Sequence, residues 1–262
     1  MALTTDFPSI KDQVSPEEWQ ARVELAACYR LVDHFGMTDL TYNHITYHIP
    51  GTNHMLVNLY GLLYREITAS SLVKMDLDGN VIWKPDTDYD RSVSGYVIHG
   101  AIHKAREDAA CVIHTHSQAG MAVSCMEEGL LPITQTSMRF ANHIGYHDYE
   151  GPAIDLDEQR RLVEHLGPHH AMILRNHGLI TCGPSVGEAF NLMYHLDLAC
   201  KTQVDVMAAR AQVTVPPADV VAHTAHMYQP TTRRPYGVLE WPAMLRLLKY
   251  EYGNSGFPQY DS

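Results

Sequence analysis

Apolar residues recur every four positions near the start of this chain, which predicts an amphipathic helix. Residues 15–18, Ser-Pro-Glu-Glu, combine an N-cap serine, a proline at the first helical position and a glutamate at the third, so the helix is predicted to begin there. Gly36 is expected to end it. The predicted buried face consists of Trp19, Val23, Ala27 and Leu31.

Short apolar runs alternate with further helical segments along the rest of the chain. Strands are predicted over residues 45–49, 55–59, 111–116, 171–174 and 179–182, and helices over 93–106, 117–126, 157–166, 185–211 and 241–252. The pair Asp78-Gly79 lies between apolar runs and predicts a hairpin. This order predicts an α/β protein with three α/β/α layers around a central mixed or largely antiparallel sheet.

A break at Pro216-Pro217 separates the last part of the chain from this pattern. We expect one domain over residues 1–211 and a C-terminal extension over residues 212–262 that packs on the same or a neighbouring subunit. A lid and an intersubunit arm are both open roles for the extension, because no residue in it decides between them.

The overall charge and composition narrow the class of protein. The formal net charge is −11, which argues against nucleic acid and anionic membranes as partners, because both require a basic face. No apolar stretch reaches the length of a transmembrane helix, and the N-terminus lacks the pattern of a secretory signal. The five scattered cysteines are typical of reduced thiols, so a cytoplasmic protein is expected.

Two histidines, His114 and His116, end a predicted buried strand. Residues i and i+2 of a strand point to the same face, so both imidazoles can approach one ion. Two polar residues on a solvated strand face are the plain alternative. His177 favours a metal site, since it lies in a tight turn after another predicted strand. Three neutral histidines with an open fourth position suit catalytic zinc, and also manganese, cobalt or iron(II).

Other polar residues offer weaker candidates. His99 and His103 have the spacing of a helical metal pair, which more often arises from an ordinary helix face, although His99 could lie close to the main site. Arg139 and Arg175 could each pair with a substrate carboxylate. For Arg175, a structural ion pair is an equally good interpretation.

Six short segments match a single family pattern: residues 36–46, 76–79, 99–106, 112–116, 174–181 and 187–190. Together they resemble the class II aldolase/adducin family over roughly residues 16–211. The resemblance implies a class II aldolase-like α/β/α fold, a homotetramer and one divalent metal ion, most often zinc, near a subunit boundary. In the sugar-phosphate aldolases of the family, a His-x-His pair and a later His in an Asn-His-Gly turn hold that ion. These positions correspond to His114, His116 and His177.

One departure from the family pattern removes the expected proton carrier. The aldolases of the family have a general acid/base glutamate four residues before the position of His99, where this chain has Gly95. Glycine cannot move a proton, so a Tyr, a His or a metal-bound hydroxide must replace the glutamate. Tyr96 is our first candidate because it is adjacent in the chain, and His99 is the second.

A second departure concerns the family's phosphate-binding loop. A Gly-Asn pair there lets backbone amides approach phosphate, whereas this chain has Tyr42 and Asn43. Only Asn43 and Gly61 match that site, and the ring of Tyr42 should block phosphate. We therefore expect a small non-phosphorylated substrate, with an aromatic compound as one option, in contact with these three residues and Arg139.

Three functions are compatible with these residues. The favoured one is a metal-dependent lyase, in which the ion acts as a Lewis acid and stabilises the enolate of a retro-aldol cleavage or a decarboxylation. The second is a non-haem iron oxygenase acting on an aromatic acid, as described for certain superfamily members from aminocoumarin antibiotic pathways. The third is a non-enzymatic assembly module like the adducin head domain, although the complete set of three histidines argues for catalysis.

Overall fold

The computed structural model describes residues 6–91, 93–151, 156–210, 212–253 and 256–262. Its centre is an eight-stranded sheet with the strand order β4-β3-β2-β1-β5-β8-β7-β6. All neighbouring strands are antiparallel except β6 and β7, which are parallel, so the predicted mixed sheet is confirmed. The strands are β1 His44–His48, β2 His54–Val57, β3 Val73–Asp76, β4 Val81–Trp83, β5 Cys111–Thr115, β6 Gly145–His147, β7 Ala171–Leu174 and β8 Gly178–Gly183.

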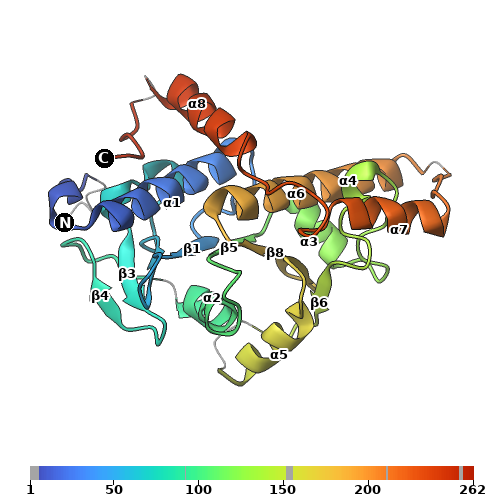
Figure 1. Cartoon of the computed structure of the whole chain (residues 1–262), viewed down its shortest axis with the longest axis horizontal. Helices are drawn as coiled ribbons and strands as arrows, with labels where there is room; N and C mark the ends of the chain where they lie inside the picture. Colours follow the sequence, from blue (N-terminus) through green and yellow to red (C-terminus); the bar gives the residue numbers. More distant parts are fainter. Residues whose placement is uncertain (1–5, 92, 152–155, 211, 254–255) are drawn as a thin grey trace.

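Helices cover both faces of this sheet, which confirms the predicted three layers. Helices α1 and α6 lie on one face and α2 and α5 on the other, while α8 packs over α1 and α6 (Figure 1). One buried core lies on each side of the sheet. The α-helices are α1 Pro16–His34, α2 Val93–Ala105, α3 Gln118–Ser124, α4 Gln135–Met138, α5 Leu156–Leu166, α6 Val186–Ala208, α7 Ala218–Met227 and α8 Glu240–Tyr252; three 3-10 turns are η1 Lys11–Gln13, η2 Tyr64–Glu66 and η3 Ala69–Ser71.

Helix α1 begins and ends as predicted, but its buried face differs in the first two turns. The Ser15 hydroxyl accepts a hydrogen bond from the amide of Glu18 at 3.2 Å, and Gly36 has the positive φ of a helix stop. Trp19 and Val23 are only partly buried. Glu18 and Arg22 are buried in their place.

An internal ion pair explains that shift of the buried face. The Glu18 carboxylate lies 2.9 Å from the Arg22 guanidinium and 2.7 Å from the Lys74 ammonium. Arg22 also donates to the carbonyls of Ala69 and Leu72. Because each buried charge has a partner, the helix can turn this polar pair inward, which a search for apolar spacing does not detect.

The C-terminal part of the chain contains one helix that the sequence did not predict. Helix α7 contacts α4, and α8 contacts α1 and α6 of the same chain. The Trp241 ring lies against Gly187, where a Cβ atom would approach it to 3.0 Å. The carbonyls of Tyr260 and Ser262 accept hydrogen bonds from the amides of residues 69 and 70. Residues 212–253 and 256–262 therefore pack extensively on this chain itself.

The five cysteines are all unpaired thiols. Four are buried in the interior, and Cys125, directly after α3, is exposed; the buried four are Cys28, Cys111, Cys182 and Cys200. In the part of the chain that the structure describes, no helix combines the length and apolar character needed to cross a membrane.

Candidate metal centre

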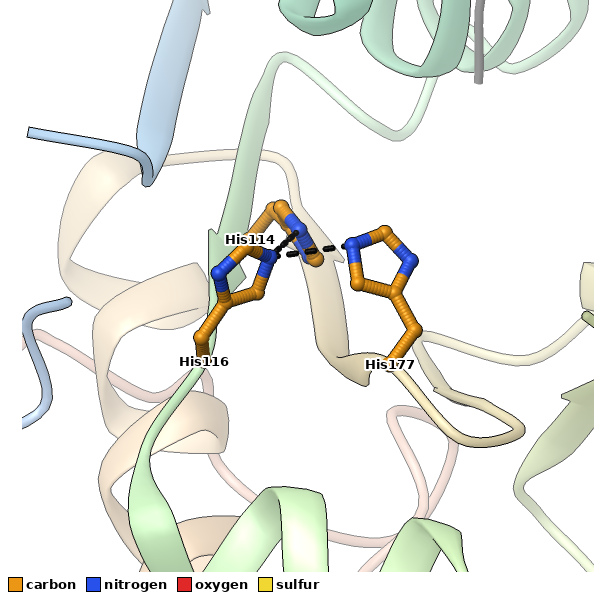
Figure 2. Close-up of side chains that lie close together, drawn as sticks. All are labelled: His114, His116 and His177. Atoms are coloured by element: carbon orange, nitrogen blue, oxygen red, sulfur yellow. Dashed lines mark hydrogen bonds between the residues drawn. The ribbon is translucent and has the colours of Figure 1, made fainter. Parts of the chain in front are cut away.

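Three imidazoles converge at one end of the central strands. His114 is the fourth residue of β5, His116 follows that strand, and His177 lies in the turn between β7 and β8. The Nε2 atom of His116 is 2.8 Å from Nε2 of His114 and 2.9 Å from Nε2 of His177 (Figure 2). The structure thus brings together all three histidines that the sequence singles out, although they come from segments about sixty residues apart.

The turn that carries His177 owes its shape to its two neighbours. Asn176 has a φ of +56°, a left-handed conformation that asparagine tolerates better than most residues. At Gly178, a Cβ atom would lie 2.4 Å from the carbonyl oxygen of Thr115. Only glycine lets β8 approach β5 this closely, so the Asn-His-Gly sequence places the imidazole beside the end of β5.

Hydrogen bonds fix the orientation of the first two rings. The Nδ1 atom of His114 lies 3.0 Å from the carbonyl oxygen of Leu179, and Nδ1 of His116 lies 3.1 Å from the Asp39 carboxylate. A carbonyl and a carboxylate can only accept, so both Nδ1 atoms carry the proton in the neutral rings. Each Nε2 atom is then left with a lone pair that points at the other.

The charge state of the site suits metal binding. Burial is the main cause that lowers the pKa of His114, and it lowers the pKa of His177 to about 4. Both imidazoles are therefore neutral at neutral pH, as a metal ligand must be. Lone pairs 2.8 Å apart repel each other, and a divalent cation between them removes that repulsion. The three side chains therefore fit a divalent ion with nitrogen preference and at least one further coordination position.

His99 lies deep beneath this site and does not reach it directly. Its side chain is fully buried, with Nε2 3.0 Å from Nδ1 of His44 and Nδ1 2.8 Å from the hydroxyl of Thr46. The ring of His44 lies between His99 and the three imidazoles, 4.9 Å from the centroid of His114. His44 therefore separates the predicted residue from the site.

Tyr96 occupies a different environment from the three histidines. Its ring packs against Gly79 and Gly100, and its hydroxyl is 3.4 Å from the carbonyl of Leu77. The Arg91 guanidinium lies over the ring at 5.9 Å. Leu77 and Gly79 belong to the β3–β4 hairpin, and Gly100 belongs to α2 itself. None of these contacts is with a histidine of the metal centre, so the position of Tyr96 next to Gly95 in the chain does not make it a neighbour of the three imidazoles.

The three residues of the predicted phosphate loop also differ in their surroundings. Tyr42 is 54% exposed, with its ring 6.2 Å from that of Tyr60. Asn43 is buried, and its side-chain oxygen accepts a hydrogen bond of 2.6 Å from the amide of Asp39. Gly61 has a φ of +108°, and a Cβ atom there would lie 2.8 Å from the ring of Tyr89. Asn43 thus supports the residue that orients His116, while Tyr89 covers Gly61.

The side chains of the two arginines have partners other than the three imidazoles. Arg139 lines a cavity of about 490 Å³ with His143, Tyr228 and Tyr236, and its guanidinium stacks over the Tyr228 ring at 4.4 Å. None of the metal-site histidines lines this cavity. Arg175 donates to the carbonyls of residues 126 and 127, which is a structural role.

Three residues near the site were missed in the sequence. His44 and Asp39 contact the imidazoles as described, and the ring of Tyr149 lies 6.4 Å from that of His177. His44 carried a signal, since it follows Asn43 and directly precedes the predicted strand over residues 45–49. Its pairing with His114 across β1 and β5 could not be read from the chain, because seventy positions separate them.

The layered α/β architecture and the three-histidine centre together define a class II aldolase-type fold. The family model described as Class II Aldolase and Adducin N-terminal domain matches residues 23–204. The chain therefore belongs to the class II aldolase/adducin family, and the resemblance seen in its sequence is confirmed. Class II aldolases generally depend on a divalent metal, in agreement with the chemistry of the three imidazoles.

Relatives of this chain carry both aldolase and adducin names. A Pseudomonas aeruginosa protein, provisionally named an aldolase class 2 protein, is 44% identical over 95% of this chain and 96% of its own length. The crystal structure of an aldolase II superfamily protein from Pseudomonas syringae is 42% identical, with a TM-score of 0.87 over 97% of this chain and 100% of that one. Alpha-adducin of Rattus norvegicus is 38% identical over 90% of this chain but only 34% of its own length.

Proposed function

We propose that this protein is a metal-dependent carbon–carbon lyase acting on a small, non-phosphorylated hydroxy-carbonyl compound. The observation that carries the proposal is the set of three Nε2 atoms, with neighbours 2.8 and 2.9 Å apart and two rings locked by acceptors at Nδ1. Such a set destabilises a domain that binds no ion, because its lone pairs repel each other. The family includes relatives named as aldolases, which supports the same reaction class.

Each residue of the centre has a definite task in this proposal. His114, His116 and His177 would hold the ion, which when bound supplies Lewis-acid stabilisation of negative charge on a substrate oxygen. Zinc is the first expectation, with manganese, cobalt and iron as alternatives. Asp39 keeps the His116 ring in the correct tautomer, and the carbonyl of Leu179 does the same for His114. Retro-aldol cleavage and decarboxylation both place charge on such an oxygen, so either fits.

The surroundings of Gly61 support a substrate without a phosphate group. The Tyr89 ring covers Gly61, and the amide of Tyr60 is already bonded to the carbonyl of Asp90 at 2.7 Å. The same segment carries the carboxylates of Asp86, Asp88 and Asp90, which repel an anion. Calorimetry of zinc-loaded protein with a sugar phosphate tests this point, and tight binding would remove the restriction.

A second function is favoured by one comparison. Alpha-adducin matches 90% of this chain at 38% identity, so a non-enzymatic assembly module is the competing proposal. That role requires no ion, so failure of the protein to bind zinc, manganese or iron(II) would favour it. We further propose a homotetramer, which light scattering on the purified full chain can test independently.

The deciding experiment is elemental analysis of full-length protein purified without added metal, beside two variants. His114→Ala removes one ligand, and His223→Ala removes an exposed histidine of α7 as a matched control. About one equivalent of zinc or manganese in the wild type and in His223→Ala, but not in His114→Ala, supports the lyase and justifies a screen of hydroxy-carbonyl compounds. Bound iron with oxygen consumption in the presence of an aromatic acid would replace it with an oxygenase.

A further inference from the structure

We propose that His44 presents an unprotonated Nε2 atom to the metal centre and there accepts a hydrogen bond from a ligand hydroxyl, because a buried chain of hydrogen bonds fixes its tautomer. The identity of the ligand rests on the proposed function, whereas the tautomer does not. The positioning residues are His99 and His103 of α2 and Thr46 of β1.

The chain consists of four consecutive contacts. Nδ1 of His103 is 2.9 Å from the carbonyl oxygen of Ala109, and Nε2 of the same ring is 2.7 Å from the Thr46 hydroxyl. That hydroxyl is 2.8 Å from Nδ1 of His99, whose Nε2 is 3.0 Å from Nδ1 of His44. Every contact has hydrogen-bond length, and in three of the four both partners could in principle act as donor or acceptor.

The Ala109 carbonyl removes that ambiguity, because it can only accept. It requires a proton on Nδ1 of His103, so Nε2 of a neutral His103 must accept from the Thr46 hydroxyl. The hydroxyl has given its one proton and must accept from Nδ1 of His99. The Nε2 atom of His99 then accepts from Nδ1 of His44. The last unassigned atom, Nε2 of His44, is left with a lone pair.

This assignment needs neutral rings, and burial supplies them. Loss of solvation lowers the pKa of His103 to about 4 and lowers that of His99 well below the usual value. The reverse polarity would set a lone pair of His103 against the Ala109 carbonyl. A buried acceptor that is left without a donor lowers the stability of a protein by about 1–3 kcal/mol, so the reverse direction is disfavoured.

The sheet places His44 beside the metal ligands. His44 and His114 are directly paired across β1 and β5, so both side chains project from the same face. Their rings are 4.9 Å apart with an interplanar angle of 38°. Nδ1 of His44 is engaged by His99, and its Nε2 makes no hydrogen bond with any residue that the structure describes. A ligand on the three imidazoles is the remaining partner for this lone pair.

Helix α2 holds the His44 ring in this position from the other side. A Cβ atom on Gly95 would lie 3.1 Å from Cγ and 3.2 Å from Cδ2 of His44. A side chain at this position would therefore press on the ring and require it to shift by a few tenths of an ångström. The absence of a side chain at Gly95 removes the expected proton carrier. The same absence leaves room for the ring of His44, a nitrogen base, beside the site.

A lone pair at this point selects the chemistry of the ligand. It attracts a hydroxyl group, and it repels an ether, carbonyl or carboxylate oxygen placed at the same point. The site should therefore prefer compounds that carry a free hydroxyl next to the carbonyl oxygen that approaches the ion. Hydroxyacetone and methoxyacetone are a matched pair of probes, because they differ only in the methylation of that hydroxyl.

The tautomer is tested first, by ¹⁵N NMR of the histidine rings in zinc-loaded, full-length protein. We expect protonated Nδ1 and unprotonated Nε2 for His44, His99 and His103, and a mixture at His44 in Thr46→Val, where the chain is interrupted. Thr224→Val, at an exposed helical hydroxyl, is the control and should leave the wild-type pattern. A proton on Nε2 of wild-type His44 overturns the proposal, whatever reaction the protein catalyses.

The acceptor role is tested next, by calorimetry of the same zinc-loaded protein with the two probes. We expect hydroxyacetone to bind at least about tenfold more tightly than methoxyacetone, and His44→Phe to abolish that preference while zinc content stays at the wild-type level. A preference that survives in His44→Phe, or no preference in the wild type, counts against the role. Loss of the lyase proposal alone, through a negative activity screen, would leave both results standing.

Discussion

Two groups of histidines lie side by side in this protein and use their nitrogen atoms in opposite ways. In the metal centre, the Nε2 atoms of His114 and His116 lie 2.8 Å apart, and in neutral rings with acceptors at Nδ1 both of them carry lone pairs. In the chain from His103 to His44, every contact pairs one donor with one acceptor. The first arrangement is complete only with a cation, whereas the second is satisfied by the protein alone.

The difference teaches that the partner of Nδ1 decides what a buried histidine can do. A carbonyl or carboxylate at Nδ1 turns Nε2 into an acceptor in both groups, as seen for His114, His116 and His103. When the neighbour of Nε2 is another acceptor, the two atoms form a cation site. When the neighbour is a hydroxyl group, the two form a link of a hydrogen-bond chain. Residue type and burial alone do not separate these outcomes.

Removing one imidazole should break the cation site completely. In His116→Ala, two nitrogen ligands remain, and we expect metal affinity to fall by more than about 100-fold, since even outer-shell partners of ligands contribute 10–100-fold. The fold should persist, because His116 lies beyond the end of β5 and outside its pairing with β8. Competition with a fluorescent chelator gives the affinity, and circular dichroism gives the fold. Metal retained at wild-type affinity would exclude His116 as a ligand.

Weakening the acceptor at Nδ1 of His116 should lower metal affinity without removing a ligand, which tests whether the partner of Nδ1 controls the metal centre. Asp39→Asn replaces the carboxylate that orients His116 with an amide that can also donate, so the ring can turn over. We expect metal affinity to fall by about 10–100-fold, less than in His116→Ala, in the same competition assay. His223→Ala serves as the control. An unchanged affinity would show that Asp39 is merely a neighbour of the ring.

Filling the space at Gly95 should damage the hydrogen-bond chain and spare the cation site. Gly95→Glu places a side chain against the ring of His44, and crowding of this kind destabilises a protein by about 1–3 kcal/mol. Denaturant unfolding measures the loss, and Gly95→Ala should show a smaller effect of the same sign. Ordinarily alanine stabilises a helix relative to glycine, so a gain in stability in Gly95→Ala would contradict the close packing.

Acid should destabilise the metal-free protein through the buried rings. His103 has a pKa of about 4 when folded and about 6.5 when unfolded, so the unfolded chain binds more protons between these values. Stability is therefore full above about pH 6.5 and is lost as the pH falls towards 4. Between pH 7 and pH 5 we expect the free energy of unfolding of His103→Gln to fall by about 2 kcal/mol less than that of the wild type, measured by urea unfolding. Equal slopes would contradict a buried neutral His103.

Most of the fold could be predicted from the sequence because its elements follow apolar spacing. The hairpin at Gly79, the cap at Ser15 and the long helix α6 are present as predicted. Helix α7 was missed because only Val221 and Ala225 of its ten residues are buried, which leaves almost no periodic signal. Trp19 and Val23 were placed on the buried face because apolar spacing cannot reveal a paired Glu18 and Arg22.

The candidate site was predictable to a lesser degree. The positions of His114, His116 and His177 followed from local strand and turn patterns, and the structure brings them together. His44, Thr46 and Asp39 depend on the pairing of β1 with β5, a long-range register that periodicity does not contain. Tyr96 was chosen because it is adjacent to Gly95 in the chain. Successive residues of a helix point about 100° apart, so Tyr96 does not share the direction of Gly95. Its ring faces the hairpin, while His99 faces the sheet.

The distribution of the thiols gives this protein a natural attachment point for a spectroscopic reporter. Burial raises the pKa of Cys182 and Cys200 to about 12, and the other interior thiols are also held in the unreactive form. Cys125 is exposed and shares an open groove of about 590 Å³ with Tyr149 and Asn176, the residue before His177. A dye coupled to this thiol in the unmodified sequence would sit beside the turn that carries the third imidazole and signal the arrival of an ion or ligand as a change in emission.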